Sequence, residues 1–528
     1  MSLTLDPIFS KSMVLQRGMP VPIWGTAEPG QPVTVSVQGA QASATADDAG
    51  SWRCVLPELA ASDAETLVAE GPDGRIEVSD VAVGEVFVAG GQSNMELWMR
   101  YECHLAEVVP TCENPRIRFY DMPKCSYPGQ LDDFDYSEAG FWRKATASDL
   151  ERFSAAGYFF ARELEAALDV PVGIEGCNYG GTKSSAWMSE ANARRVQRPQ
   201  VEVFERSLQG LSCDELLAHG RLNPRNDKGY ATWPAWNEFF LTATRTAEEA
   251  AVFFEREARA AAAMATPAGS ERSADADPLA SHPGILTPTK DAPGALFEHM
   301  VLPLAPFAVR GVLWYQGESD DEDPGAQVCH RDALACIIDD WRAAWEDPGL
   351  PFLVVQLPGF RVWRGMDLDA DDWVTIRAAQ QEVADAVDGV WLCSIGDAGE
   401  EMDIHPKDKL VVGHRLALLA LRHLFGRDVL ADAPRLTGVA REGGAIRLRF
   451  SHADGLAVKG DEVSALEVLA GGASLPFTSR VQGSELVVVP DAEQEGSVTV
   501  RLGWQNWHII NLVNAAGIPA LPFEVEIG

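Results

Sequence analysis

Short apolar runs that end in turn residues recur along this chain, and between about residues 83 and 425 they alternate with amphipathic stretches. The apolar runs are rich in Val, Ile, Leu, Phe and Ala, which is typical of strands buried on both faces; they lie at 84–90, 171–177, 309–316, 351–357 and 389–396. The helical stretches lie at 154–168, 330–346 and 408–424. This alternation predicts an α/β region with a parallel sheet that helices cover on both faces.

The regions on either side of this series have a different pattern. Residues 1–82 contain short alternating segments separated by turn residues, which indicates a small β-sandwich, and the chain becomes β-rich again over 429–528. We therefore expect three domains, with a central domain at 83–428. An insertion at about 190–300 interrupts the central series and includes a predicted helix at 237–264. A substrate wall or lid and a surface decoration are both consistent with it.

The charge is one-sided, with 43 Lys and Arg against 78 Asp and Glu, a net charge of −35. Such a surface repels phosphate backbones and anionic membranes, so we expect no nucleic-acid or membrane partner. An anionic substrate would need local Arg or Lys residues that offset the field. The chain has no run of about 18 apolar residues, so we expect no membrane span. It has no signal-like start, so we expect a cytoplasmic location.

Cysteine usage argues against a zinc site. The nine cysteines are an odd number without C-x-x-C spacing, which disfavours both a zinc centre and a complete disulfide framework and fits a reducing compartment. We expect no metal and no other cofactor.

A candidate nucleophile follows the first of the buried runs. The strand at 84–90 ends in Gly90-Gly91, and Ser93 comes two residues later. Glycines allow a sharp turn there, and a serine after it is held at the carboxyl edge of the sheet, where open α/β folds bind ligands. The alternative is a serine that only caps the next helix. The segment does not match the G-x-S-x-G nucleophile elbow, because Met95 occupies the last glycine position.

Three further polar segments come directly after other strands of the same predicted sheet. They are Asn178–Trp187, Trp314–Asp320 and Gly396–Pro406. If the strands are parallel, all of these segments meet Ser93 at one edge of the sheet. We expect the functional site there.

These segments contain what ester hydrolysis requires. A serine hydroxyl needs a neighbouring imidazole to take its proton, and His405 follows a core strand with carboxylates close by. Asp403 is the first candidate to orient its ring, with Asp397 and Glu401 as alternatives. Ser319 is a rival nucleophile, but the acidic residues after it disfavour an alkoxide.

Donors for a developing oxyanion are also present. They are the amide of Ser93, a glycine amide at 180–181 and the side-chain amide of Gln316. Each has a simpler alternative, since Gly180-Gly181 can be a tight turn and Gln316 can satisfy buried backbone groups.

Four motifs, in order, resemble the sialate O-acetylesterase family of SGNH hydrolases, and the resemblance covers nearly the whole chain. They are Gly-Gln-Ser-Asn-Met-Glu at 91–96, Gly-Gly-Thr at 180–182, Trp-Tyr-Gln-Gly-Glu-Ser at 314–319 and Asp-Ile-His-Pro at 403–406. The resemblance implies a flavodoxin-like SGNH domain and metal-free hydrolysis of O-acetyl groups on sugars. O-acetylated sialic acid is the first expectation; acetylxylan, another acetylated sugar or a non-sugar acyl ester is the alternative. A non-catalytic carbohydrate-binding protein is disfavoured by the intact serine and histidine.

The same resemblance implies roles for individual residues. Ser93 would be the nucleophile, His405 the base and Asp403 its partner, with Gly181 and Gln316 in the oxyanion hole. The wider superfamily usually places its aspartate three residues before the histidine, where this chain has Met402. Two positions depart from relatives in residues expected near the substrate: Asp320, often Asn, and Phe297-Glu298, often Tyr-Asn.

Substrate contacts are assigned to polar and aromatic residues near the motifs. Trp98 and Trp187 are expected to line the sugar pocket, as is Trp314, and packing is the alternative role for each. Glu318 is expected to contact the substrate, and Arg377 to bind a sialic acid carboxylate, with Arg361 and Arg364 as alternatives. The oligomeric state is left open, a homo-oligomer included.

Overall fold

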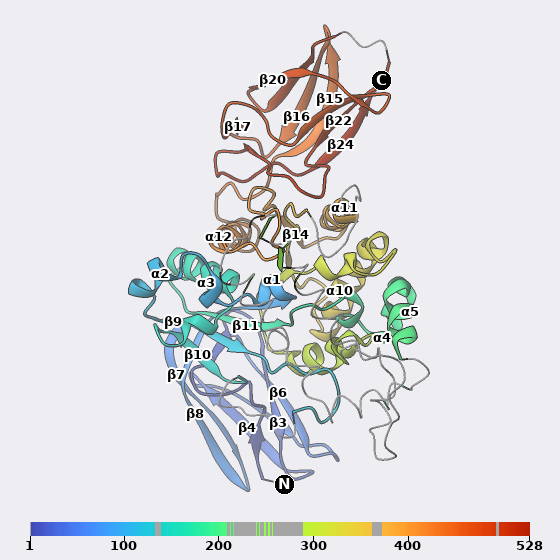
Figure 1. Cartoon of the computed structure of the whole chain (residues 1–528). Helices are drawn as coiled ribbons and strands as arrows, with labels where there is room; N and C mark the ends of the chain where they lie inside the picture. Colours follow the sequence, from blue (N-terminus) through green and yellow to red (C-terminus); the bar gives the residue numbers. More distant parts are fainter. Residues whose placement is uncertain are drawn as a thin grey trace.

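The computed structural model describes residues 2–131, 139–208, 289–361, 372–492 and 496–528, together with a few isolated positions between 209 and 288. The helix expected at 237–264 and most of the insertion lie outside these residues. In Figure 1 the N-terminal strands lie at the bottom, the helix-covered sheet in the middle and the C-terminal strands at the top. The chain is thus a mixed α/β protein with several sheets, as the sequence predicts.

Six neighbouring parallel strands form the centre of the molecule, in the order β9-β11-β8-β12-β13-β14. Their bounds are β8 Gly74–Gly91, β9 Asn114–Asp121, β11 Val172–Asn178, β12 Gly311–Tyr315, β13 Phe352–Val355 and β14 Val390–Cys393. β10 (Trp142–Ala145) adds an antiparallel edge strand beside β9. All five predicted apolar runs are strands of this sheet. Counted along the chain, these six parallel strands have the order 2-3-1-4-5-6, and without the outer strand β9 the order is 2-1-3-4-5.

Side chains of β8 alternate between two hydrophobic cores. Val86 and Val88 belong to one core, and Phe87 and Ala89 to the other. A continuous apolar run is therefore explained by burial on both faces of the sheet.

Helices supply the other half of each core. α3 (Ala155–Leu168) and α12 (Leu410–Leu419) pack together over the face of Phe87, and α10 (His330–Ala344) covers the face of Val86. α3 begins where Ser154 Oγ accepts the Gly157 amide at 3.1 Å, an ordinary N-cap. The remaining described helices are α1 Ser93–Glu96, α2 Leu105–Val108, α4 Glu190–Val196, α5 Arg198–Ser207, α9 Leu302–Leu304 and α11 Asp372–Ala386. Among the described residues, no helix combines the length and apolar character that crossing a membrane requires.

The N-terminal strands are continuous with the central sheet through β8. This strand first pairs with β7 in antiparallel fashion and with β2 in parallel, and then becomes a central strand of the parallel sheet. The expected domain boundary at residue 82 falls within it. The other N-terminal strands are β1 Thr4–Leu5, β2 Val14–Gln16, β3 Val21–Thr26, β4 Pro32–Val37, β5 Ala40–Thr45, β6 Ser51–Leu56 and β7 Ser62–Gly71.

A buried carboxylate on β8 ties the two regions together where the pairing changes. Glu85, with a fully buried side chain, accepts hydrogen bonds from Gln16 Nε2 at 2.8 Å, Arg17 Nε at 2.7 Å and Arg310 Nε at 2.8 Å. These hydrogen bonds, two of them from arginines, offset the desolvation cost of burying the Glu85 carboxylate.

The C-terminal region contains two four-stranded antiparallel sheets, β15-β16-β21-β20 and β19-β18-β22-β24. Their inner faces share one core that includes Leu448, Val468 and Val500. The bounds are β15 Arg435–Glu442, β16 Ala445–Ser451, β18 Leu466–Ala470, β19 Ala473–Ser474, β20 Phe477–Gln482, β21 Glu485–Pro490, β22 Val498–Leu502 and β24 Phe523–Ile527; β17 Ala457–Val458 pairs with β23 Leu512–Val513.

Arg377 joins this C-terminal region to the central one. Its guanidinium, on α11, is 1% exposed and donates to the carbonyls of Gly503 at 3.1 Å, Asn506 at 3.3 Å and Gln505. Burial lowers the pKa of Arg377 to about 9. The two terminal nitrogens of Arg377 thus belong to a structural joint, and its expected role in binding a substrate carboxylate stays a prediction.

We predict that Arg377→Ala destabilises the protein by about 3 kcal/mol, because it removes several charge-assisted hydrogen bonds and leaves buried carbonyls without donors. The melting temperature should fall by several degrees, and limited proteolysis should cut first around residues 503–506. Arg480→Ala is the matched control, since Arg480 is an exposed arginine of β20. Equal melting temperatures for the two variants would contradict the prediction.

Candidate active site

The carboxyl ends of three central strands lie level with one another. Gly91 at the end of β8 pairs in register with Asn178 of β11 and with Tyr315 of β12. β13 and β14 continue the alignment, with Val355 opposite Cys393. The predicted convergence of the four polar segments at one sheet edge is thus confirmed.

Ser93 is the first residue of α1, directly beyond the end of β8. Gly91 has a φ of +127°, and a Cβ on it would lie 2.1 Å from the Tyr315 carbonyl oxygen, so only glycine fits this approach. The next amide, of Gln92, donates to the same carbonyl at 3.0 Å. These contacts turn the chain sharply and hold Ser93, which is 6% exposed, above the sheet edge.

Asn94 connects the serine segment to the histidine segment. Its Nδ2 donates to the carbonyl of Ile404 at 2.8 Å and to Glu318 Oε1 at 2.6 Å, while its Oδ1 accepts from Lys409 Nζ at 2.6 Å. Since Asn94 follows Ser93 and Ile404 precedes His405, this bridge holds the two candidate catalytic residues in adjoining segments. His405 is itself 4% exposed.

Asp403 lies beside the His405 ring without a hydrogen bond to it. Its Oδ1 is 4.0 Å from Nδ1 of the ring and accepts the backbone amide of His405 at 2.9 Å. Its Oδ2 accepts from Lys407 Nζ. Burial raises the pKa of Asp403 to about 6, although Lys407 opposes the shift. The carboxylate thus organises the 403–407 loop.

The two alternative acids have other partners. Asp397 binds Arg415 through both oxygens, at 2.6 and 2.8 Å, and Glu401 binds Arg361 at 2.5 Å. Of the three candidates, Asp403 is therefore the one that the structure leaves beside His405.

The His405 imidazole is held in its neutral form. Burial lowers its pKa well below the usual value, and the nearby charges of Lys407 and Lys409 lower it further. A neutral imidazole can accept a proton, which is what a general base must do. The sequence interpretation missed both lysines, although they follow His405 within four residues.

Lys409 and Glu318 are a buried, oppositely charged couple on either side of Asn94. Burial raises the pKa of Glu318 to about 7 and lowers that of Lys409 to about 7. Glu318 contacts Asn94 directly, so the structure places it beneath the catalytic turn. Its expected contact with the substrate stays a prediction.

The turn after β11 lies against α1. The Gly180 amide donates to Glu96 Oε2 at 2.6 Å, and Gly181 follows with a φ of +65°. Gln316 Nε2 donates to Thr182 O at 3.4 Å and to Asp320 Oδ1 at 3.2 Å. Gly181 and Gln316 are therefore brought together near the serine, although the Gln316 amide here also fastens the turn.

Asp320 is the hub beneath this turn. Fully buried, it accepts hydrogen bonds from the Ser184 amide at 2.9 Å, Gln200 Nε2 at 2.7 Å and His330 Nδ1 at 2.7 Å, in addition to Gln316. The Asp at this position, where relatives often have Asn, therefore affects the residues that hold the site in place.

The rival nucleophile and one expected sugar contact have structural roles. Ser319 is 2% exposed, and its Oγ lies 3.3 Å from the side-chain amide of Gln92. Trp187 is fully buried, packs against Trp314 and Trp341, and donates from Nε1 to Thr182 Oγ1 at 2.9 Å. Its indole packs in the core, which is the alternative role expected from the sequence for Trp187 beside a contact with sugar.

Trp98 remains available at the surface. It is half-buried, and the guanidinium of Arg100 lies 4.8 Å from its ring centre. Trp314, like Trp187, is fully buried. Arg364 lies outside the described residues.

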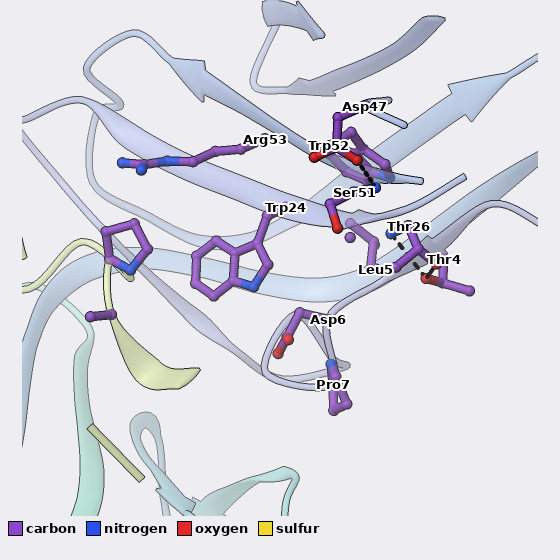
Figure 2. Close-up of a pocket in the computed structure, with 13 residues that line it drawn as sticks. Thr4, Leu5, Asp6, Pro7, Trp24, Thr26, Asp47, Ser51, Trp52 and Arg53 are labelled. Atoms are coloured by element: carbon purple, nitrogen blue, oxygen red, sulfur yellow. Dashed lines mark hydrogen bonds between the residues drawn. The ribbon is translucent and has the colours of Figure 1, made fainter. Parts of the chain in front are cut away.

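A hollow of about 510 Å³ lies elsewhere, in the N-terminal region. Figure 2 shows Trp24, Arg53 and Asp6 around it, and Ala305 and Pro306 complete its wall. It contains none of the four motif segments, so it is separate from the candidate site.

Positive charge is concentrated at the site. Five of the nine lysines in the chain contact the loops at this edge: Lys124, Lys183, Lys290, Lys407 and Lys409. Three of them pair with carboxylates at the same edge, Lys124 with Glu96, Lys183 with Asp323 and Lys407 with Asp403.

Comparison with known proteins gives consistent results. Residues 291–421 match the family described as carbohydrate esterase, sialic acid-specific acetylesterase. The mouse (Mus musculus) sialate O-acetylesterase is 23% identical over 446 residues, covering 77% of this chain and 71% of its own length. The human (Homo sapiens) sialate O-acetylesterase is 25% identical over 233 residues, covering 41% of this chain and 44% of its own.

A solved structure extends the likeness to the whole chain. The crystal structure of a carbohydrate acetylesterase from Xanthomonas citri matches with a TM-score of 0.74 at 28% identity and covers 99% of each chain. Together with the serine and histidine segments at one sheet edge, these matches indicate a carboxylic ester hydrolase that is similar to the sialate O-acetylesterases and, over its whole length, to a carbohydrate acetylesterase.

Proposed function

We propose that this chain removes O-acetyl groups from sialic acid by an acyl-enzyme mechanism, with Ser93 as nucleophile, His405 as general base and Asp403 as its partner. The observation that carries the proposal is the Asn94 bridge, which holds the Ser93 turn against the segment that contains His405. Apart from the outer strand β9, the parallel strands have the order 2-1-3-4-5, which supports a flavodoxin-like SGNH core, in which ligands bind outside the carboxyl ends of the strands.

The first half of the reaction transfers the acetyl group to the enzyme. Ser93 Oγ attacks the ester carbonyl carbon while His405 takes the hydroxyl proton. The tetrahedral intermediate collapses, the bond to the sugar oxygen breaks, and His405 returns the proton to that oxygen. In the second half a water molecule, deprotonated by His405, attacks the acetyl-serine and releases acetate.

Amide donors stabilise the oxyanion. The backbone amides of Ser93 and Gly181 and the side-chain amide of Gln316 are the donors that the proposal assigns. The contact between Gly180 and Glu96 supports it, because it sets the 180–182 turn beside the helix that Ser93 begins. Removal of one such donor typically costs about 10²–10³ in rate.

Asp403 supports His405 through the loop and through its charge. The 4.0 Å gap to Nδ1 is wider than a hydrogen bond, and hydrogen bonds of this kind often tighten only when substrate is bound. An imidazolium formed during the reaction is attracted to the Asp403 carboxylate, which offsets the repulsion from Lys407.

Ser93→Ala tests the assignment of the nucleophile. We expect kcat for p-nitrophenyl acetate to fall by at least about 10⁴-fold, because the variant lacks the hydroxyl that the proposal assigns to the acyl-enzyme. Ser319→Ala is the matched control and should retain activity within about tenfold. Activity that survives Ser93→Ala and disappears in Ser319→Ala would reverse the assignment. A wild type that prefers long acyl chains would favour a non-sugar acyl esterase.

The pH profile tests the electrostatics around His405. Because its pKa is lowered and the neutral ring is the active form, the acid limb of kcat/KM should lie below the ordinary histidine range near pH 6.5. Lys407→Met removes a nearby positive charge, so the pKa of His405 should rise and the acid limb should move to higher pH.

Lys459→Met serves as the control for this profile, since Lys459 is an exposed lysine whose recorded ion pair is with Asp397, at 3.8 Å. It should leave the acid limb in place. An acid limb that moves equally in both variants, or that moves down in Lys407→Met, would contradict the proposed base.

Positive charge beside the oxyanion turn supports an anionic sugar. Lys290 Nζ contacts the Gly180 carbonyl and lies 3.2 Å from the position of a Cβ on Gly181. Lys124 and Lys290 both lie over the Tyr179 ring, at 5.9 and 4.9 Å from its centre. With Arg377 assigned to a structural joint, these lysines are the groups that we propose to attract a sialic acid carboxylate.

Substrate comparison tests this step. We expect acetate release from O-acetylated N-acetylneuraminic acid to exceed that from its carboxylate methyl ester and from acetylated xylo-oligosaccharides. Lys290→Met should lower kcat/KM for the free acid by about tenfold, which is a typical effect for one charge-assisted contact. It should leave kcat/KM for the methyl ester unchanged. Lys290→Arg should keep the preference of the wild type for the free acid over the methyl ester. Faster release from the xylo-oligosaccharides would instead indicate a neutral sugar substrate.

A further inference from the structure

Four side chains with metal-binding atoms meet at a second place, next to the loop that contains His405. They are Glu102, Cys103, His104 and Asp408, and their donor atoms all lie within 4.8 Å of one another. Three of these residues are consecutive, in the turn between Met99–Tyr101 and α2, and the fourth comes from the segment before α12.

The spacing of the donor atoms fits a single ion. His104 Nδ1 lies 2.8 Å from Glu102 Oε1, 3.3 Å from Cys103 Sγ and 3.9 Å from Asp408 Oδ1, and Cys103 Sγ lies 3.7 Å from Glu102 Oε1. Zinc binds nitrogen and oxygen at about 2.0–2.2 Å and sulfur at about 2.3 Å in a tetrahedron, which separates its donors by about 3.3–3.7 Å. The observed distances lie around this range.

The arrangement differs from that of a catalytic relay. In a nucleophile–histidine–carboxylate relay, the two ring nitrogens face different partners. Here Nδ1 pairs with Glu102 Oε1 at 2.8 Å, the Cys103 thiol donates to the same oxygen, and Asp408 Oδ1 lies 3.9 Å from Nδ1, so all four side chains face one point. A shared cation satisfies them together.

The surroundings provide both an anchor and an entrance. The side chain of Glu102 is fully buried, whereas the side chains of His104 and Asp408 are 29% and 44% exposed, and Cys103 lies at the surface. An ion can therefore enter from solvent and reach a fixed inner ligand.

We propose that Glu102, Cys103, His104 and Asp408 bind a divalent zinc-like ion that fastens the 99–104 turn to the loop of His405. The backbone already begins this connection, since the Cys103 amide donates to the Lys407 carbonyl at 3.2 Å. Asp408 is three residues beyond His405, so the ion limits the motion of the base. It takes no part in the ester chemistry, and the site stands whatever the acyl substrate is.

This proposal departs from the expectation of no zinc site. That expectation rested on C-x-x-C spacing, but here one cysteine combines with a histidine and two carboxylates, one of them far away in the sequence. Mixed donor sets of this kind have no short sequence signature.

Metal titration of the full-length protein tests the site. After chelation and gel filtration, the wild type should bind one equivalent of Zn²⁺, measured by elemental analysis. Co²⁺ should give a near-ultraviolet thiolate-to-cobalt absorption band. Cys103→Ser should abolish the band, and Asp408→Asn should weaken Zn²⁺ binding by at least about 10–100-fold, the loss that even outer-shell changes produce. Hydrogen exchange over 403–409 should slow when Zn²⁺ is added to the wild type.

Cys329→Ser is the matched control, since Cys329 is a half-buried thiol outside the cluster, and it should bind both metals like the wild type. Circular dichroism of each variant checks its fold. The proposal is overturned if the wild type takes up no stoichiometric metal, if Cys103→Ser keeps the cobalt band, or if exchange over 403–409 is unchanged by Zn²⁺.

Discussion

The close approach of Gly91 to the Tyr315 carbonyl is the constraint on which the site depends. At this point β8 and β12 are in register and the chain must turn at once, which leaves no room for a side chain at Gly91. The turn places Ser93 at the start of α1 and Asn94 where its amide reaches the Ile404 carbonyl. Any enlargement of residue 91 would separate two strands and move the serine away from the histidine segment.

The site is also unusual in how many charged groups it buries. Asp403 with Lys407, and Glu318 with Lys409 across Asn94, lie within a few residues of the proposed base. Buried charges of opposite sign gain little net stability, because desolvation offsets their attraction, whereas loss of one partner of a direct pair such as Asp403–Lys407 is costly, typically about 3–5 kcal/mol. Their evident contribution is to set the protonation of His405 and the position of its loop.

Much of the fold follows from local patterns. The apolar run of β8 and the other predicted strands are confirmed, because burial on both faces leaves a clear compositional mark. The convergence of the motif segments is confirmed as well, since parallel strands must end at one edge. The structural joint of Arg377 was not predictable, because its partner carbonyls, such as that of Gly503, come from a distant segment. For Trp187, packing was one of the two roles expected. Nearness in sequence to a motif says little about the direction in which a side chain points.

The length of β8 has a consequence for how this protein can be altered. One strand supplies both the edge pairing of the N-terminal region and the middle of the catalytic sheet, and Glu85 is bonded from both sides of that transition. The N-terminal region is therefore not joined to the central sheet by a linker, and it cannot be exchanged as a separate domain. A graft at residue 82 would cut a strand in half, so recombination with relatives should succeed only where the whole of β8 is inherited from one parent.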